Sequence, residues 1–158
     1  QERAAFAALC KDGASLLPSL LEHVNSRGSL LLIDRLLHVP VLREAFIACG
    51  GVERVCGGAD ENVLCEGPRV LVRAMHDASF VASAEVANAL ASFTFRALTS
   101  ARATLGSQVG ALELCRELAF FDDHHAVVTA LLKDPAVATV LSKSPQLTEL
   151  ARTLVNTF

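Results

Sequence analysis

The sequence contains no tryptophan and no tyrosine, so its eight phenylalanines are the only residues of the large aromatic class. Single-stranded nucleic acids bind on platforms of stacked aromatic side chains, which this composition disfavours. The formal net charge is -3 at pH 7, so the chain also lacks the basic excess that attracts nucleic acid or anionic lipid. We therefore expect neither a nucleic-acid partner nor a membrane partner.

Long hydrophobic runs and a regular cysteine pattern are missing as well. No apolar run reaches the roughly 18 residues of a membrane span, and the N-terminus lacks the pattern of a secretory signal. Five cysteines at irregular spacing do not form a disulfide framework, which predicts free, mostly buried thiols in a reducing compartment. We expect a cytoplasmic protein, with nuclear or cytoskeletal location as alternatives, and not a secreted one.

The size and composition are those of one folded domain. Hydrophobic residues make up 52% of the 158 residues and charged residues 20%, which excludes a disordered chain. A compact fold of this mass exposes about 7,700 Å², so a sizeable core forms without disulfides or metals. We treat residues 1–158 as a single domain, and the absence of an initial methionine predicts a segment of a longer protein.

Helical periodicity dominates the chain, and strand-like alternation is scarce. Glycine, proline and capping residues divide the sequence into about eleven short helices. Gly13 and the pair Gly67-Pro68 are expected to interrupt helices, and Ser15, Ser29 and Ser107 to begin them. The predicted segments are 2–10, 15–25, 29–38, 40–49, 52–57, a short turn after Asp60, 68–77, 83–99, 108–121, 122–133, 135–142 and 145–156.

A five-residue pattern recurs four times, with an aliphatic residue, a central arginine and a second apolar residue. Its copies start at Ile33, Leu71, Leu114 and Leu150, at offsets of 38, 43 and 36 residues. The two apolar positions lie four residues apart, so they share the buried face of a helix. The arginine between them therefore points away from the core. Those arginines are Arg35, Arg73, Arg116 and Arg152.

Several stretches resemble the armadillo repeat. They are the segments beginning at Gly50-Gly51 and at Ser107, and the closing Leu154-Val155-Asn156, in four partial repeats at 13–39, 41–78, 80–121 and 123–157. The resemblance implies an all-α fold, a right-handed α-solenoid of about four repeats, in which the third helix of each repeat lines an extended concave surface. It implies that the four arginines form a ladder in that groove.

Such a ladder suits a partner protein or peptide with an acidic segment, because guanidinium groups bind carboxylates bidentately. The alternative is that arginine merely occupies a solvated helix face. Importin-α-type members use a Trp–Asn ladder for basic cargo, and this chain matches it only at Asn156, so that function is not expected. The expected partner-binding residues are Arg35, Arg73, Asp77, Arg116, Phe120, Arg152 and Asn156.

The sequence has few clusters of residues that could act in catalysis or bind a metal. Adjacent His124 and His125, flanked by Asp122 and Asp123, point in different directions on a helix, so we expect a structural role and no metal site. No phosphate loop or nucleophile motif occurs, and we expect neither an enzyme nor a bound cofactor. Phenylalanines that could anchor a peptide are expected instead mostly in the core. They are Phe93, Phe95, Phe120 and Phe121.

These observations predict a non-catalytic interaction module, a scaffold or adaptor that binds an acidic peptide or helix. The alternative is an assembly or dimerisation domain of a cytoskeletal or large-complex subunit, which would self-associate through its apolar terminal helices.

Overall fold

The computed structural model describes residues 2–76, 80 and 82–158. Within these residues every regular element is helical, which confirms the all-α class. The elements are α1 (Glu2–Glu22), α2 (Arg27–Leu36), α3 (Pro40–Ala48), α4 (Gly51–Cys56), α5 (Glu61–Met75), α6 (Ala84–Thr99), α7 (Leu105–Ala119), the 3-10 turn η1 (Asp122–His124), α8 (His125–Lys133), α9 (Pro135–Ser142) and α10 (Pro145–Asn156).

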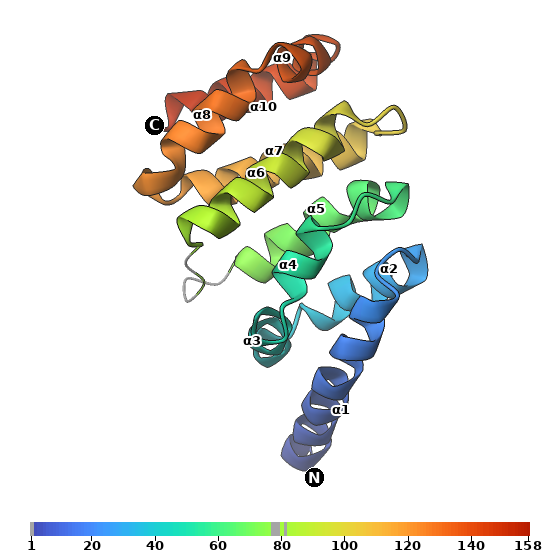
Figure 1. The fold of residues 1–158 in the computed structure, drawn as a ribbon. Helices are drawn as coiled ribbons and strands as arrows, with labels where there is room; N and C mark the ends of the chain where they lie inside the picture. The colour runs from blue at the N-terminus through green and yellow to red at the C-terminus, as the bar shows by residue number, and fades with distance from the viewer. Residues whose placement is uncertain (1, 77–79, 81) are drawn as a thin grey trace.

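The helices stack in chain order and form two rows (Figure 1). In one row α2, α5, α7 and α10 each pack on the next, and in the other α3, α4 and α6 are followed by α8 and α9. The buried apolar side chains of both rows form one continuous core. The first half of α1 projects beyond the stack (Figure 1), and the accessible surface of 8623 Å² exceeds that expected for a compact fold of this mass.

Helix starts follow the caps that the sequence provides. The side chains of Asp60 and Ser83 accept hydrogen bonds from the first turns of α5 and α6. Proline occupies the first position of α3, α9 and α10, where its missing N–H has no helical partner to lose. These boundaries agree with the predicted segments to within one or two residues.

The predicted break at Gly13 is wrong, because α1 runs without interruption past Ser15 and Pro18. Gly13 is buried, and a Cβ there would lie 3.0 Å from Leu42 Cδ1 on α3. The glycine therefore lets α1 and α3 approach closely, and packing outweighs its low helix propensity. Ser15 is not a cap, since its hydroxyl donates to the Lys11 carbonyl within the helix.

The predicted interruption at Gly67-Pro68 is also wrong, because α5 is continuous and both residues are buried within it. A Cβ on Gly67 would lie 2.8 Å from Phe93 Cζ and 3.1 Å from Val55 Cγ1. The absent side chain allows α5 to approach α4 and α6 closely. Tertiary packing thus stabilises a helix that local propensity alone would break.

Two predicted N-caps are displaced by three residues. α2 begins after Ser26, so Ser29 lies inside the helix. α7 begins after Thr104, whose hydroxyl accepts from the Ser107 N–H while the Ser107 hydroxyl accepts from the Thr104 N–H. This reciprocal pair is a capping box, so Ser107 contributes to the cap from the third helical position.

Candidate functional site

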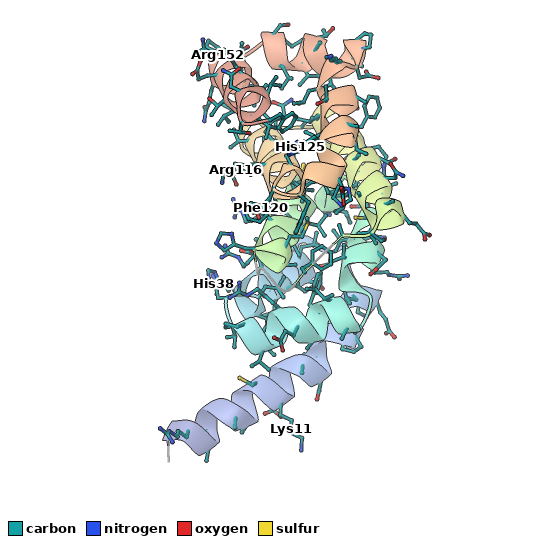
Figure 2. The ribbon with its side chains drawn as sticks, turned by 90° about the vertical axis from the view of Figure 1, so that its left-hand side faces the viewer. Lys11, His38, Arg116, Phe120, His125 and Arg152 are labelled. Carbon is teal, nitrogen blue, oxygen red and sulfur yellow. The ribbon has the colours of Figure 1, made fainter. Side chains whose placement is uncertain are left out.

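The candidate site is the solvent side of the row α2, α5, α7 and α10, which we name the ladder face. The repeated five-residue pattern orients all four helices in the same way. Its apolar residues are at most 6% exposed in the first three copies, and the last copy has a half-buried Leu150 and a buried Leu154. The central arginines are therefore turned toward solvent. Figure 2 shows Arg116 and Arg152 along one side of the molecule, with His38 farther along that side.

Arg73 is engaged in a contact between helices. Its Nε donates to Asp34 Oδ1 on α2 at 2.8 Å, and its Nη1 lies 3.2 Å from His38 Nδ1. The side chain of Asp34 is only 13% exposed and that of Arg73 is 31% exposed, so the pair is partly shielded from water. This contact joins α2 to α5 and also fixes the orientation of the guanidinium.

The other three arginines of the pattern differ in their partners. Arg152 donates to both carboxylate oxygens of Glu149 in its own helix, at 2.8 and 2.6 Å, and this carboxylate raises the pKa of Arg152. Arg35 and Arg116 are exposed and have no side-chain partner among the described residues. The ladder is therefore not a set of four equivalent free cations.

The remaining predicted site residues lie at helix ends. Phe120 directly follows α7 and is 79% exposed, with its ring edge-on to Phe121 at 5.6 Å between centroids. Asn156 is exposed at the end of α10. Asp77 lies outside the described residues. Among the phenylalanines expected in the core, Phe93 is fully buried, so core packing is correct for Phe93 and wrong for Phe120.

Two adjoining hollows lie on the ladder face over α2, α5 and α7. One, of about 450 Å³, lies between the end of α2, α3, α5 and α7, and includes Arg43, Arg69, Arg73 and Glu113. The other, of about 550 Å³, lies over the first halves of α5 and α7 and is also lined by Arg69 and Glu113. Because they share these two side chains, the hollows adjoin each other, and we refer to them together as one groove.

Sequence reasoning missed Arg43, Arg69 and the contribution of His38 to this groove. Arg69 lies four residues before Arg73, one helical turn away on the same face, so helical spacing alone could have identified it. Arg43 projects from α3, outside the repeated pattern, and only the packing of α3 against α5 brings it to the hollow.

Two other arginines have structural roles away from the ladder face. Arg54 Nε donates to the Leu21 carbonyl at 3.3 Å, and Arg96 donates to the Cys56 and Gly58 carbonyls, each at 2.6 Å. These carbonyls lie at or just beyond helix C-termini, where backbone acceptors lack helical partners. Arg54 and Arg96 therefore tie successive helices together.

The histidine pair is explained by structural hydrogen bonds. His124 is buried and its Nε2 donates to the Ala82 carbonyl at 2.8 Å. His125 Nε2 donates to the Ala119 carbonyl at 2.6 Å, and its ring stacks on Phe158 at 4.4 Å. No cluster of three metal-ligating side chains occurs within the described residues.

The cysteines are free, as expected, but differ in burial. Cys10, Cys56 and Cys115 are buried, Cys65 is half-buried and Cys49 is exposed. Burial raises the pKa of both Cys56 and Cys115 to about 12, because a thiolate there would be desolvated. Neither buried thiol is suited to nucleophilic chemistry at neutral pH.

Comparisons of the chain with protein-family models, with curated proteins and with solved structures find no match. Within the described residues one helical stretch, Arg3–Glu22 in α1, is long and apolar enough to cross a membrane, although Lys11 and Asp12 interrupt it. A core helix or an N-terminal signal meets the same criterion.

Proposed function

We propose that this chain is an armadillo-like α-solenoid segment that binds an extended acidic peptide along the ladder face, as a non-catalytic interaction module. The observation that carries the proposal is the row of four consecutive helices with arginines at the same position of a repeated pattern. The groove of the two hollows lies over α2, α5 and α7 of this row, and the exposed, unpaired Arg69 lines both hollows.

The hydrogen bonds support a repeating architecture. The side-chain hydrogen bonds between residues farthest apart in the sequence join positions 33 to 42 residues apart. One joins Arg54 on α4 to Leu21 on α1, and another joins His124 in η1 to Ala82, just before α6. This range includes the offsets of 38 and 36 residues between copies of the pattern and ends one residue below the third, 43. Neighbour-only contacts of this kind are typical of solenoids. Four right-handed repeats are the arrangement that we propose from the spacing.

The charges on the ladder face favour an anionic ligand. The acidic side chains of its four helices are mostly paired, as in Arg73–Asp34, Arg27–Glu66 and the pair of Arg152 with Glu149. Glu61 pairs with Arg102, and Glu117 lies 3.4 Å from His76 Nδ1. Among the described side chains of these helices, the unpaired charges are Arg35, Arg69, Arg116 and Glu113, so the remaining charge is positive.

The dimensions of the face set the length of the probe. Four packed helices at about 8–10 Å spacing span about 24–30 Å between the outer axes. An extended chain rises about 3.3 Å per residue, so about eight residues cross the face. A fluorescein-labelled decapeptide of alternating glutamate and alanine is therefore a suitable probe, and the same peptide with lysine for glutamate is its counterpart.

The test is fluorescence anisotropy with the double variant Arg35→Glu, Arg116→Glu. Both side chains are exposed and without partners among the described residues, so their reversal leaves the helix contacts intact. A charge-assisted hydrogen bond contributes about 1.5–3 kcal/mol, and about 1.4 kcal/mol corresponds to tenfold in affinity. We expect the double variant to bind the glutamate peptide at least tenfold more weakly than the wild type.

The matched control reverses two lysines of the other row, Lys133→Glu and Lys143→Glu, which changes the net charge by the same amount. The control variant should retain wild-type affinity to within about threefold. Equal weakening by both double variants, or tighter binding of the lysine peptide, contradicts the proposal. Circular dichroism before the titrations establishes that all variants are folded.

A second candidate function, self-association, is favoured by α1. Its projecting half exposes a stripe that includes Ala4, Ala7 and Ala8, and Leu16 is 49% exposed. Sedimentation velocity from micromolar to millimolar concentration tests this directly. A strictly monomeric wild type rejects it, whereas a dimer that Leu16→Glu dissociates supports it.

A further inference from the structure

The hollow of about 450 Å³ on the ladder face concentrates positive charge from two helices. Arg43 comes from α3, and Arg69 and Arg73 come from successive turns of α5. His38 and His76 complete its basic lining, and Glu113 is the acidic side chain that lines it. This accumulation lies in a chain whose net charge is -3.

The three guanidinium groups are in different states. Arg73 is oriented by Asp34 Oδ1, as described above. Arg69 is exposed and has no ion pair with the described residues. The Nε of Arg43 is buried and lacks a hydrogen-bond acceptor, although the side chain lines the hollow. A ligand in the hollow does not reach this shielded Nε, so Arg43 contributes to the hollow through its positive charge and the part of its side chain that lines it.

The acidic groups around the hollow offset this charge only from behind its lining. The three arginines and Glu113 that line the hollow carry a formal charge of +2 with neutral histidines. Asp34, bound to Arg73, and Glu117, 3.4 Å from His76 Nδ1, bring the wider sum to 0, but neither carboxylate lines the hollow. For the lining itself, a ligand that brings two negative charges and several acceptor oxygens is therefore a better complement than a single carboxylate.

We propose that this hollow binds the phosphoryl group of a phosphorylated side chain in the partner peptide. This inference rests on the proposed function. A planar carboxylate offers two oxygens and is satisfied by one guanidinium, whereas a phosphoryl group offers three, which matches donors that arrive from two helices. The volume exceeds that of a phosphate and also accommodates the side chain that carries it. The adjoining hollow, which shares Arg69 and Glu113, holds the neighbouring peptide residues.

The experiment compares three labelled decapeptides that differ at one central position, which is serine, glutamate or phosphoserine within the glutamate–alanine sequence. We expect the phosphoserine peptide to bind the wild type at least tenfold more tightly than the serine peptide, and more tightly than the glutamate peptide. In Arg69→Gln this preference should fall to threefold or less.

Arg35→Gln is the matched control, because Arg35 lies on the ladder face but does not line the hollow. It should weaken all three peptides and keep the preference for phosphoserine. Since both side chains are exposed, thermal melts are expected to show both variants folded. Isothermal titration calorimetry with inorganic phosphate tests whether the hollow also binds free phosphate in the absence of a peptide.

The outcomes separate the two proposals. If the acidic peptides bind but phosphoserine gives no preference, the phosphoryl site is refuted and the proposed function stands. A preference that Arg69→Gln leaves unchanged also refutes the site. Saturable binding of inorganic phosphate without a phosphopeptide preference assigns the hollow to a free anion and refutes the peptide-borne group. If no peptide binds, both proposals fail.

Discussion

Replacement of Gly67 by alanine tests the close packing of helices on which the ladder face depends. In an exposed helix interior this change stabilises by about 1 kcal/mol, because alanine has the higher helix propensity. Here the added Cβ would lie 2.8 Å from Phe93 Cζ and 3.1 Å from Val55 Cγ1, in a region where both neighbours are fully buried. Overpacking of this kind costs about 1–3 kcal/mol, and at 2.8 Å we place the cost in the upper part of that range.

We therefore expect Gly67→Ala to lower the free energy of unfolding by about 1–2 kcal/mol, which corresponds to a fall of about 2–8 °C in Tm. Urea denaturation followed by circular dichroism measures the first quantity, and a thermal melt measures the second. The matched control is Gly110→Ala in α7, where the new Cβ would meet Pro68 Cβ at 3.6 Å, an ordinary contact. The control should be neutral or stabilised by up to about 1 kcal/mol. If Gly67→Ala is as stable as Gly110→Ala, the packing of α5 against α4 and α6 is not as close as described.

Two further predictions concern charge. Asp34→Ala removes the acceptor of the 2.8 Å bond from Arg73 and should lower the free energy of unfolding, measured in urea, by about 1–3 kcal/mol. In an Arg73→Ala background the same substitution should cost clearly less, and an equal loss there would show that the pair is not coupled. Burial raises the pKa of Cys56 and Cys115 from 9.0 to about 12, so each thiol ionises more readily in the unfolded chain. The free energy of unfolding should therefore be unaffected by these thiols below pH 9 and should fall as the pH rises toward 12. The slope is about 1.4 kcal/mol per pH unit for each thiol, and the variant Cys56→Ala, Cys115→Ala should flatten it; an unchanged alkaline slope would contradict the assigned burial.

The sequence was sufficient for the helical class and for those boundaries that a local side chain determines. Asp60 and Ser83 mark helix starts through hydrogen bonds within their own first turns, so nothing distant needs to be known. The wrongly predicted helix breaks at Gly13 and Gly67-Pro68 depend instead on residues that are distant in the sequence. Each glycine is retained inside a helix because a side chain more than twenty residues away in the sequence occupies the adjacent space, namely Leu42 and Phe93.

The candidate site was predictable to a similar degree. Helical spacing placed four arginines on one side of their helices, because that orientation depends only on buried residues two positions before and after. It could not reveal that Asp34 engages Arg73, since this contact depends on the register between α2 and α5. Nor could it reveal Arg43, which reaches the groove from α3.

The pairing of charges determines how the ladder face can recognise a ligand. Because most of its acidic side chains already bind a neighbouring cation, the face has little net charge and exerts little attraction beyond a Debye length of about 8 Å. Selectivity must then come from the few unpaired groups at short range, chiefly Arg35, Arg69 and Arg116. A peptide with uniformly distributed acidic residues meets only some of them, whereas one with its densest charge opposite the hollow of Arg69 meets three guanidinium groups together. The affinity should therefore depend on the position of the negative charge within the peptide more than on its total.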